Sequence, residues 1–171
     1  MNPIDELLFL RDGGAVARFH TSRIRPQSVA EHSVGVAEVI LHIRPTASAG
    51  LLRAALRHDV YEAITGDSPA TAKWEHPELR SALTVIEERL ELERSLLPVL
   101  QVMDTQLLKW ADMAELVLYC IEEWQRGNRF AAPIIRNGVE ALKALPLHDT
   151  DTARASELFS YLISATGVVN E

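Results

Sequence analysis

The chain has 171 residues, of which 47% are hydrophobic, and a formal net charge of −7 at pH 7. A chain of this length buries most of its surface in one core, so we expect a single domain over residues 1–171. The negative charge argues against binding to a nucleic-acid polymer, because such binding needs a basic surface that displaces counterions. A phosphate-bearing ligand would therefore have to be held by a metal or by a few placed cations.

Two features indicate the compartment. The N-terminal residues lack the basic and apolar stretches of a signal peptide, and no later apolar run is long enough to cross a bilayer. The single cysteine, Cys120, lies in the apolar run 117–121, where we interpret it as a buried, inert thiol rather than a nucleophile. We therefore expect a soluble protein in a reducing cytoplasm, without a membrane partner.

The apolar spacing is helical along nearly the whole chain, which predicts an all-α fold with six or seven helices in one compact bundle. A short first helix over residues 4–10 is expected to stop at Gly13 and Gly14, and residues 18–27 are expected to form an ordered loop. The second helix begins with the capping box Ser28-Val29-Ala30-Glu31. Its buried stripe is expected to contain Val29, Ser33, Val36, Ile40 and Ile43.

A third helix is predicted over residues 47–64, ending at the turn Thr65-Gly66-Asp67-Ser68-Pro69. Its expected buried residues are Leu51, Leu52, Ala55 and Leu56. A fourth is predicted from Pro77 to Arg94, with its charged stretch facing solvent. The remaining helices are expected over residues 104–126, 132–145 and 152–165. In the last of these, Leu158, Phe159 and Leu162 either close the bundle or mediate self-association.

Some side chains could ligate a metal if the helices bring them together: His32, His58, Asp59 and Asp112. Each alone has a plainer explanation. A histidine beside an apolar stripe is more often a satisfied core or surface residue. Asp112 could instead form an ion pair with Lys109, which precedes it on the same helix.

The adjacent pair His58 and Asp59 is more informative, because it closes an apolar segment and is followed by Glu62. We expect Glu62 on the same helical face. Burying two carboxylates and an imidazole together is costly unless a cation pairs with them. A divalent metal would remove that cost, and mixed nitrogen and oxygen ligands suit Zn, Co or Mn better than Ca.

The order His32, His58-Asp59, Asp112 resembles the H…HD…D metal signature of HD-domain phosphohydrolases, an all-α class. Stretches 18–19, 28–33, 58–69 and 109–112 are similar to the bacterial 5′-deoxynucleotidase subfamily. They also resemble its short phage relatives, the dATP triphosphohydrolases of phages that build genomes with 2-aminoadenine. The resemblance covers about residues 1–145 and implies the cytoplasm of a bacterium or of a phage-infected host cell. Phe19 departs from it, because the deoxynucleotidases carry tryptophan there, and this bears on sugar and base selectivity.

The resemblance implies a divalent transition metal (Zn, Co or Mn) on His32, His58, Asp59 and Asp112, with Mg²⁺ as a possible companion of the substrate phosphates. Glu62 would act as general acid or base. Arg18, Lys73 and Lys109 would approach the phosphates, Phe19 would pack on the sugar or base, and Asp67 would bind the sugar 3′-hydroxyl. Four of these residues also have a plainer interpretation. Glu62 could be a surface glutamate, and Lys73 a solvated loop lysine. Phe19 could be a simple hydrophobic contact, and Asp67 an aspartate that caps its own turn.

We therefore expect hydrolysis at the 5′-phosphate end of a small-molecule 2′-deoxynucleotide. The expectation leans to a dATP triphosphohydrolase that depletes the dATP pool, because the chain looks shorter than the bacterial monophosphatases around residues 42–48. The alternatives are a 5′-deoxynucleotidase that releases phosphate and a non-catalytic nucleotide sensor, which would not need every ligand together with Glu62. A homo-oligomer, dimer or hexamer, is expected from the apolar C-terminal residues. The other histidines, interpreted as surface or structural, are His20, His42, His76 and His148.

Overall fold

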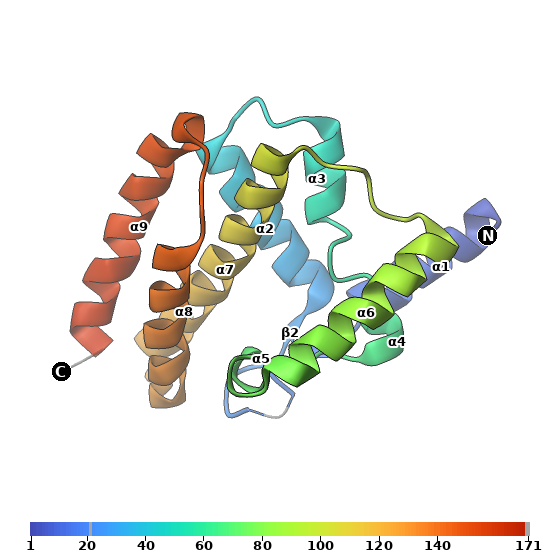
Figure 1. Cartoon of the computed structure of the whole chain (residues 1–171). Coiled ribbons are helices and arrows are strands. Elements are labelled where there is room, and N and C mark those ends of the chain that lie inside the picture. Colours follow the sequence, from blue (N-terminus) through green and yellow to red (C-terminus); the bar gives the residue numbers. More distant parts are fainter. Residues whose placement is uncertain (21, 170–171) are drawn as a thin grey trace.

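The computed structural model describes residues 1–20 and 22–169, and the regular secondary structure of this part is helical apart from one short antiparallel pair of strands (Figure 1). The pair joins β1 to β2, with Ala17 opposite Ser28 and Arg18 opposite Gln27. The all-α prediction is confirmed. The elements are α1 (Pro3–Gly14), β1 (Ala17–Arg18), β2 (Gln27–Ser28), α2 (Val29–Ile43), α3 (Ala49–Ala55), α4 (Glu62–Thr65), α5 (Ala70–Glu75), α6 (Pro77–Arg94), α7 (Val102–Gln125), a 3₁₀ turn (Arg129–Ala131), α8 (Ala132–Ala144) and α9 (Asp149–Val169).

The long helix α7 is the centre of the fold. It packs against α2, α3, α8 and α9, as Figure 1 shows for α2 and α8 on either side of it. The core residues at these contacts exclude solvent completely, among them Val36, Ile40, Leu107 and Val117. The predicted stripe of α2 is confirmed, because all its members are buried. The capping box of Ser28 and Glu31 is present and fixes where α2 begins.

A smaller apolar cluster lies under α1, α4 and α6. It is built from Val60, Tyr61, Leu90 and Leu96. Gly13 belongs to α1 and packs against this region, where an added Cβ would lie 2.7 Å from the carbonyl oxygen of Val60. α1 ends at Gly14, as predicted, but neither Gly13 nor Gly14 has the left-handed conformation that is typical of a glycine helix stop. Both glycines are part of α1, and the role of Gly13 is close packing.

The single helix predicted over residues 47–64 is also wrong. α3 ends at Ala55, a series of turns follows, and α4 begins at Glu62. The imidazole Nδ1 of His58 donates to the carbonyl oxygen of Ala55 at 2.8 Å, which satisfies a helix-terminal acceptor. Leu56, predicted to be buried, is 52% exposed because the chain turns there. The expected six or seven helices are therefore too few, since α4 and the unpredicted α5 are separate short helices.

The last helix, α9, closes the helical layer. Leu162 is completely buried, and Leu158 and Phe159 pack against the core, so these residues help to close the bundle. At the other end of α9, Arg44 donates to both carboxylate oxygens of Asp151 and also pairs with Asp104. This ion cluster joins the ends of α2, α7 and α9. No helix in the described part of the chain is long and apolar enough to cross a membrane.

Candidate metal centre and substrate cavity

The fold brings the expected metal ligands to one point from separate elements. His32 comes from α2, His58 and Asp59 from the turns after α3, and Asp112 from α7. The Nε2 atoms of His32 and His58 are 3.3 Å apart, and the Nε2 of His32 lies 3.0 Å from Asp112 Oδ1 and 3.7 Å from Asp59 Oδ2. His58 Nε2 lies 3.4 Å from Asp59 Oδ2 and 3.8 Å from Asp112 Oδ1. Donor atoms about 2.1 Å from one metal are separated by about 3.0–3.5 Å, so three of these separations fit a shared cation directly, and the pairs at 3.7 and 3.8 Å would have to close by a few tenths of an ångström.

The hydrogen bonds of the imidazoles support the same interpretation. His32 Nδ1 faces a carboxylate oxygen of Glu115, and His58 Nδ1 faces the carbonyl oxygen of Ala55. Both partners are acceptors, so each Nδ1 must carry the proton and donate it. In the neutral rings both Nε2 lone pairs then point at each other and at the carboxylates of Asp59 and Asp112. The lone pairs and the carboxylates repel one another unless a cation or a proton lies between them.

The electrostatics of the metal-free chain agree with this need for positive charge. Burial lowers the pKa of His58, but the negative charges of Asp59 and Asp112 outweigh it and raise the pKa to about 10. Burial likewise opposes protonation of His32, yet hydrogen bonds to Asp112 and Glu115 raise its pKa. Burial favours the neutral form of Asp112, but the hydrogen bonds from His32 and His58 hold its pKa well below the usual range. The group therefore binds protons tightly where a metal can replace them.

A second set of polar residues holds His32 in place; the sequence interpretation named Arg18 among them as a phosphate contact but missed Glu115 and Gln27. Glu115 is buried and accepts from His32 Nδ1 and, at 2.7 Å, from the amide of Gln27. Arg18 donates to Gln27 Oε1 at 3.2 Å and lies 3.6 Å from Glu115. Gly35 allows this approach, because a Cβ there would lie 2.7 Å from the side chain of Glu115. Glu115 follows Asp112 by three residues on α7, and that spacing was the available signal.

Glu62 begins α4, beside the metal ligands rather than on a helix shared with His58, so the expected common helical face is wrong. Its side chain is 9% exposed, and its Oε2 is buried without a hydrogen-bond partner in the described residues. Burial and the nearby charges of Asp59 and Asp67 raise its pKa to about 8. A raised pKa of this kind suits a general acid. The alternative of a solvated surface glutamate is contradicted.

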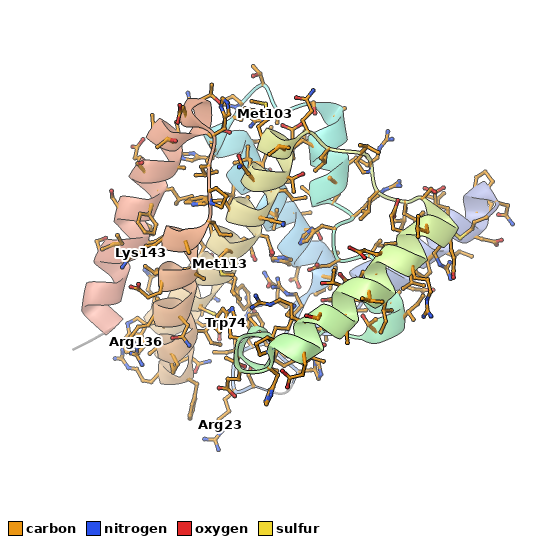
Figure 2. All side chains as sticks on the ribbon, viewed as in Figure 1. Arg23, Trp74, Met103, Met113, Arg136 and Lys143 are labelled. Carbon is orange, nitrogen blue, oxygen red and sulfur yellow. The ribbon has the colours of Figure 1, made fainter. Side chains whose placement is uncertain are left out.

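A cavity of about 580 Å³ opens next to these groups. The sequence-predicted residues around it are Arg18, Phe19, Asp59, Glu62, Asp67, Lys73, Lys109 and Asp112. Trp74 of α5 and Met113 of α7, labelled in Figure 2, also line it, together with Leu116, Ile134 and Leu145. The lining of the cavity therefore combines charged and apolar side chains. An elongated ligand with an anionic end and a flat apolar end fits this combination.

The structure shows what surrounds each of the other residues singled out in the sequence. Asp112 pairs with His32, and no ion pair with Lys109 is found among the described residues. Lys73, Lys109 and the unpredicted Arg80 line the cavity, again without an ion pair in the described part of the chain. Asp67 lies 3.6 Å from the ring of His20, which places His20 at the cavity edge. The buried state of Cys120 is confirmed, and burial raises the pKa of its thiol to about 12.

An all-α fold that gathers a histidine, a His-Asp pair and a later aspartate around one point, beside a charged cavity, defines the HD-domain phosphohydrolases. A family model described as YfbR-like 5′-deoxynucleotidase matches residues 10–155. The chain belongs to the YfbR-like 5′-deoxynucleotidase family. Membership of this family makes the chain a hydrolase.

Solved structures share the fold. The HD phosphohydrolase DatZ of cyanophage S-2L, solved with dA and one catalytic Zn²⁺ ion, superposes with a TM-score of 0.66 at 22% identity, over 92% of this chain and 95% of that chain. PH0347 from Pyrococcus horikoshii OT3 gives a TM-score of 0.69 at 20% identity, over 95% and 99%. A conserved hypothetical protein from Pyrococcus furiosus gives 0.64 at 23%, over 94% and 99%. A comparison with curated protein sequences found no significant match.

Proposed function

We propose that His32, His58, Asp59 and Asp112 hold one divalent transition metal, and that the chain hydrolyses the phosphate at the 5′ end of 2′-deoxynucleotides. The observation that carries the proposal is that the donor atoms of His32, His58 and Asp59 form one group, within 3.7 Å of one another, and that Asp112 Oδ1 lies 3.0 Å from His32 Nε2 and 3.8 Å from His58 Nε2. Asp59 and Asp112 also line the cavity. DatZ, which shares the fold, was solved with a deoxynucleoside and Zn²⁺. Zn, Co and Mn all suit this donor set.

The metal, when bound, supplies Lewis acidity toward the phosphate and activates water for attack. Glu62 is buried beside Asp59, burial raises its pKa, and in this proposal it delivers a proton to the leaving 5′-oxygen. The same carboxylate, once ionised, can accept a proton from water in the next cycle. Glu115 keeps the imidazole of His32 oriented throughout, because its hydrogen bond fixes which ring nitrogen faces the metal.

The remaining cavity residues receive the substrate in this proposal. Lys73, Lys109 and Arg80 attract the phosphate charge, and Mg²⁺ can accompany a polyphosphate. Arg18 is held by Gln27 and Glu115, so it presents its guanidinium from a fixed position. Asp67 lines the same cavity and accepts the sugar 3′-hydroxyl.

Phe19 faces the sugar and leaves no hydrogen-bond partner for a ribose 2′-hydroxyl. An unpaired buried hydroxyl costs about 1–3 kcal/mol, so we expect a preference of about ten- to a hundredfold for deoxynucleotides.

Two leaving groups are considered because different observations favour them. The family description, a 5′-deoxynucleotidase, favours release of phosphate from a deoxynucleoside monophosphate. The three cavity cations without ion pairs in the described residues, Lys73, Arg80 and Lys109, favour a more highly charged substrate such as dATP, with release of triphosphate. We place the monophosphate first, because the family match spans residues 10–155.

The test is a substrate panel with product identification. Metal-loaded protein would be given dAMP, AMP, dATP, ATP and the other deoxynucleotides, and phosphate and triphosphate would be separated by anion-exchange chromatography. Elemental analysis would identify the metal, and Asp112→Asn would serve as the matched ligand variant. Bound metal without release from any deoxynucleotide would contradict catalysis and favour the sensor. The homo-oligomer stays a prediction, which light scattering of the same sample checks.

A further inference from the structure

The backbone of Phe19 adopts an unusual conformation. Its φ is 61°, in the left-handed region, which costs an L-residue with a large side chain about 1–2 kcal/mol. The turn is held by Ser22, whose backbone amide and hydroxyl both donate to the carbonyl oxygen of Phe19, at 3.0 and 3.1 Å. A glycine would adopt this conformation without strain. The strained phenylalanine next to the cavity therefore indicates that the ring itself is needed there.

The ring of Phe19 is stacked on Tyr119. The ring centroids are 5.4 Å apart, and the planes are within 8° of parallel. Tyr119 is 6% exposed, and its hydroxyl donates to the carbonyl oxygen of Arg25 at 2.9 Å. The guanidinium of Arg25 lies 5.1 Å from the centroid of the Tyr119 ring. One face of the Phe19 ring is thus covered by an aromatic residue that is itself fixed, and Phe19 still lines the cavity.

Tyr119 lies on the same helical face as residues of the metal centre. It lies on α7, seven residues after Asp112 and four residues after Glu115. Residues with these spacings share one face of a helix. One rigid helix therefore carries three residues of this region. They are the expected ligand Asp112, Glu115, which accepts a hydrogen bond from His32, and Tyr119, on which the Phe19 ring is stacked. α7 therefore sets the spacing between Asp112 and Tyr119, the residue on which the Phe19 ring is stacked.

We propose that Tyr119 is a positioning residue for substrate selection: it holds the strained Phe19 ring against the nucleotide and so sets how strongly the cavity rejects a ribose 2′-hydroxyl. The proposal rests on the proposed deoxynucleotide function. Tyr119 acts through Phe19 and does not touch the substrate. Stacking, rather than the tyrosine hydroxyl, is the property it contributes.

The first measurement is structural and independent of activity. Crystal structures of Tyr119→Phe and Tyr119→Leu would be compared with that of the wild type, each without nucleotide. We expect Phe19 to keep its positive φ and its place in the cavity wall in Tyr119→Phe, and to leave both in Tyr119→Leu. A Phe19 ring that stays in place in Tyr119→Leu overturns the proposal.

The second measurement is the ratio of kcat/KM for dAMP to that for AMP. A lost aromatic pair biases a conformational equilibrium by about two- to twelvefold, so we expect Tyr119→Leu to narrow the ratio by that factor. Tyr119→Phe should retain the wild-type ratio. Leu162→Ala, a cavity-creating change of a completely buried residue in α9, controls for general destabilisation and should leave the dAMP-to-AMP ratio unchanged.

A double variant separates action through Phe19 from a diffuse structural effect. If Tyr119 acts through Phe19, then Phe19→Leu/Tyr119→Leu has the same sugar ratio as Phe19→Leu alone. Two results overturn the proposal. One is a double variant whose preference for dAMP over AMP falls by the sum of the two single effects, in free energy. The other is a Tyr119→Leu variant whose dAMP-to-AMP ratio of kcat/KM is unchanged. Failure of the proposed function looks different, because the wild type would then hydrolyse no nucleotide. The crystal structures would still decide whether Tyr119 positions Phe19.

Discussion

The clearest consequence of the structure concerns Glu115, which touches neither the metal position nor the substrate. Replacing it with glutamine keeps the size of the side chain and removes its charge. In the wild type, one oxygen accepts from His32 Nδ1 and the other accepts from Gln27 Nε2. A glutamine has one acceptor oxygen, so its amide must face one of these two donors. Gln27 cannot easily turn over to accept, because its own oxygen already accepts from Arg18.

The size of the effect follows from the burial of His32. This imidazole has no exposed surface, so water cannot replace the lost partner. Losing a hydrogen bond to a charged group costs about 1.5–3 kcal/mol, and altered partners behind a metal-bound histidine lower metal affinity by about 10–100-fold. We therefore expect Glu115→Gln to weaken Zn²⁺ binding by about 10–100-fold while the protein stays folded.

The assay is competition for Zn²⁺ against a chromogenic chelator, with circular dichroism to confirm folding. Turnover should recover when excess metal saturates the variant, because the ligands themselves are unchanged. Asp112→Asn provides the comparison, since it alters an expected ligand directly and should not recover in the same way. An unchanged Zn²⁺ affinity in Glu115→Gln would refute the argument that this carboxylate supports His32.

The other predictions concern the site and the core. Asp59→Ala should lose both metal and hydrolysis, checked by elemental analysis and phosphate release; retained metal with normal turnover would exclude Asp59 as a ligand. Glu62→Gln should keep the metal but lower kcat by about 100-fold, and lost metal would instead make Glu62 a ligand. Asp151→Asn should destabilise the fold by about 2 kcal/mol, seen as a lower Tm, because Arg44 loses its bidentate partner. Cys120 should resist alkylation at pH 8 until unfolded, because its raised pKa keeps the buried thiol protonated.

The sequence predicted the parts of the fold that local signals determine. The capping box at Ser28 and Glu31 fixes the beginning of α2, and the 3.6-residue apolar period fixes which face of α2 is buried. The grouping of His32, His58, Asp59 and Asp112 came from their order along the chain, through the family resemblance. Their convergence in the structure depends on the packing of α2 and α7, which periodicity alone does not specify.

The break after α3 could not be predicted in this way, because its causes lie outside the segment. Apolar residues continue at helical spacing through Val60 and Tyr61, so the period predicts one long helix. In the structure, Val60 and Tyr61 are instead recruited into the cluster with Leu90 and Leu96. The turn that takes them there also carries His58 and Asp59 toward α2. A tertiary contact therefore overrides a local preference at the position where the site is built.

The polar residues behind the site are a different case, since a signal for them was present. Asp112, Glu115 and Tyr119 share a face of α7 that also contains the buried core, and a carboxylate on an apolar face needs a partner. The partner, His32, lies 83 residues away, so the spacing identifies the need but not the residue that meets it.

The acidic character of the chain and an anionic substrate are compatible because charge is distributed unevenly. The net charge is −7, yet the side chains that line the cavity include Arg18, Lys73, Arg80 and Lys109. Charges separated by more than about 8–10 Å through solvent are largely screened at physiological salt, so the remote carboxylates contribute little at the cavity. Inside the cavity these cations lie beside the carboxylates of Asp59, Asp67, Glu87 and Asp112, so the proposed divalent metal would be needed to make the local potential favourable to a phosphate. An acidic surface around such a cavity disfavours nucleic-acid polymers while a small nucleotide can still enter it.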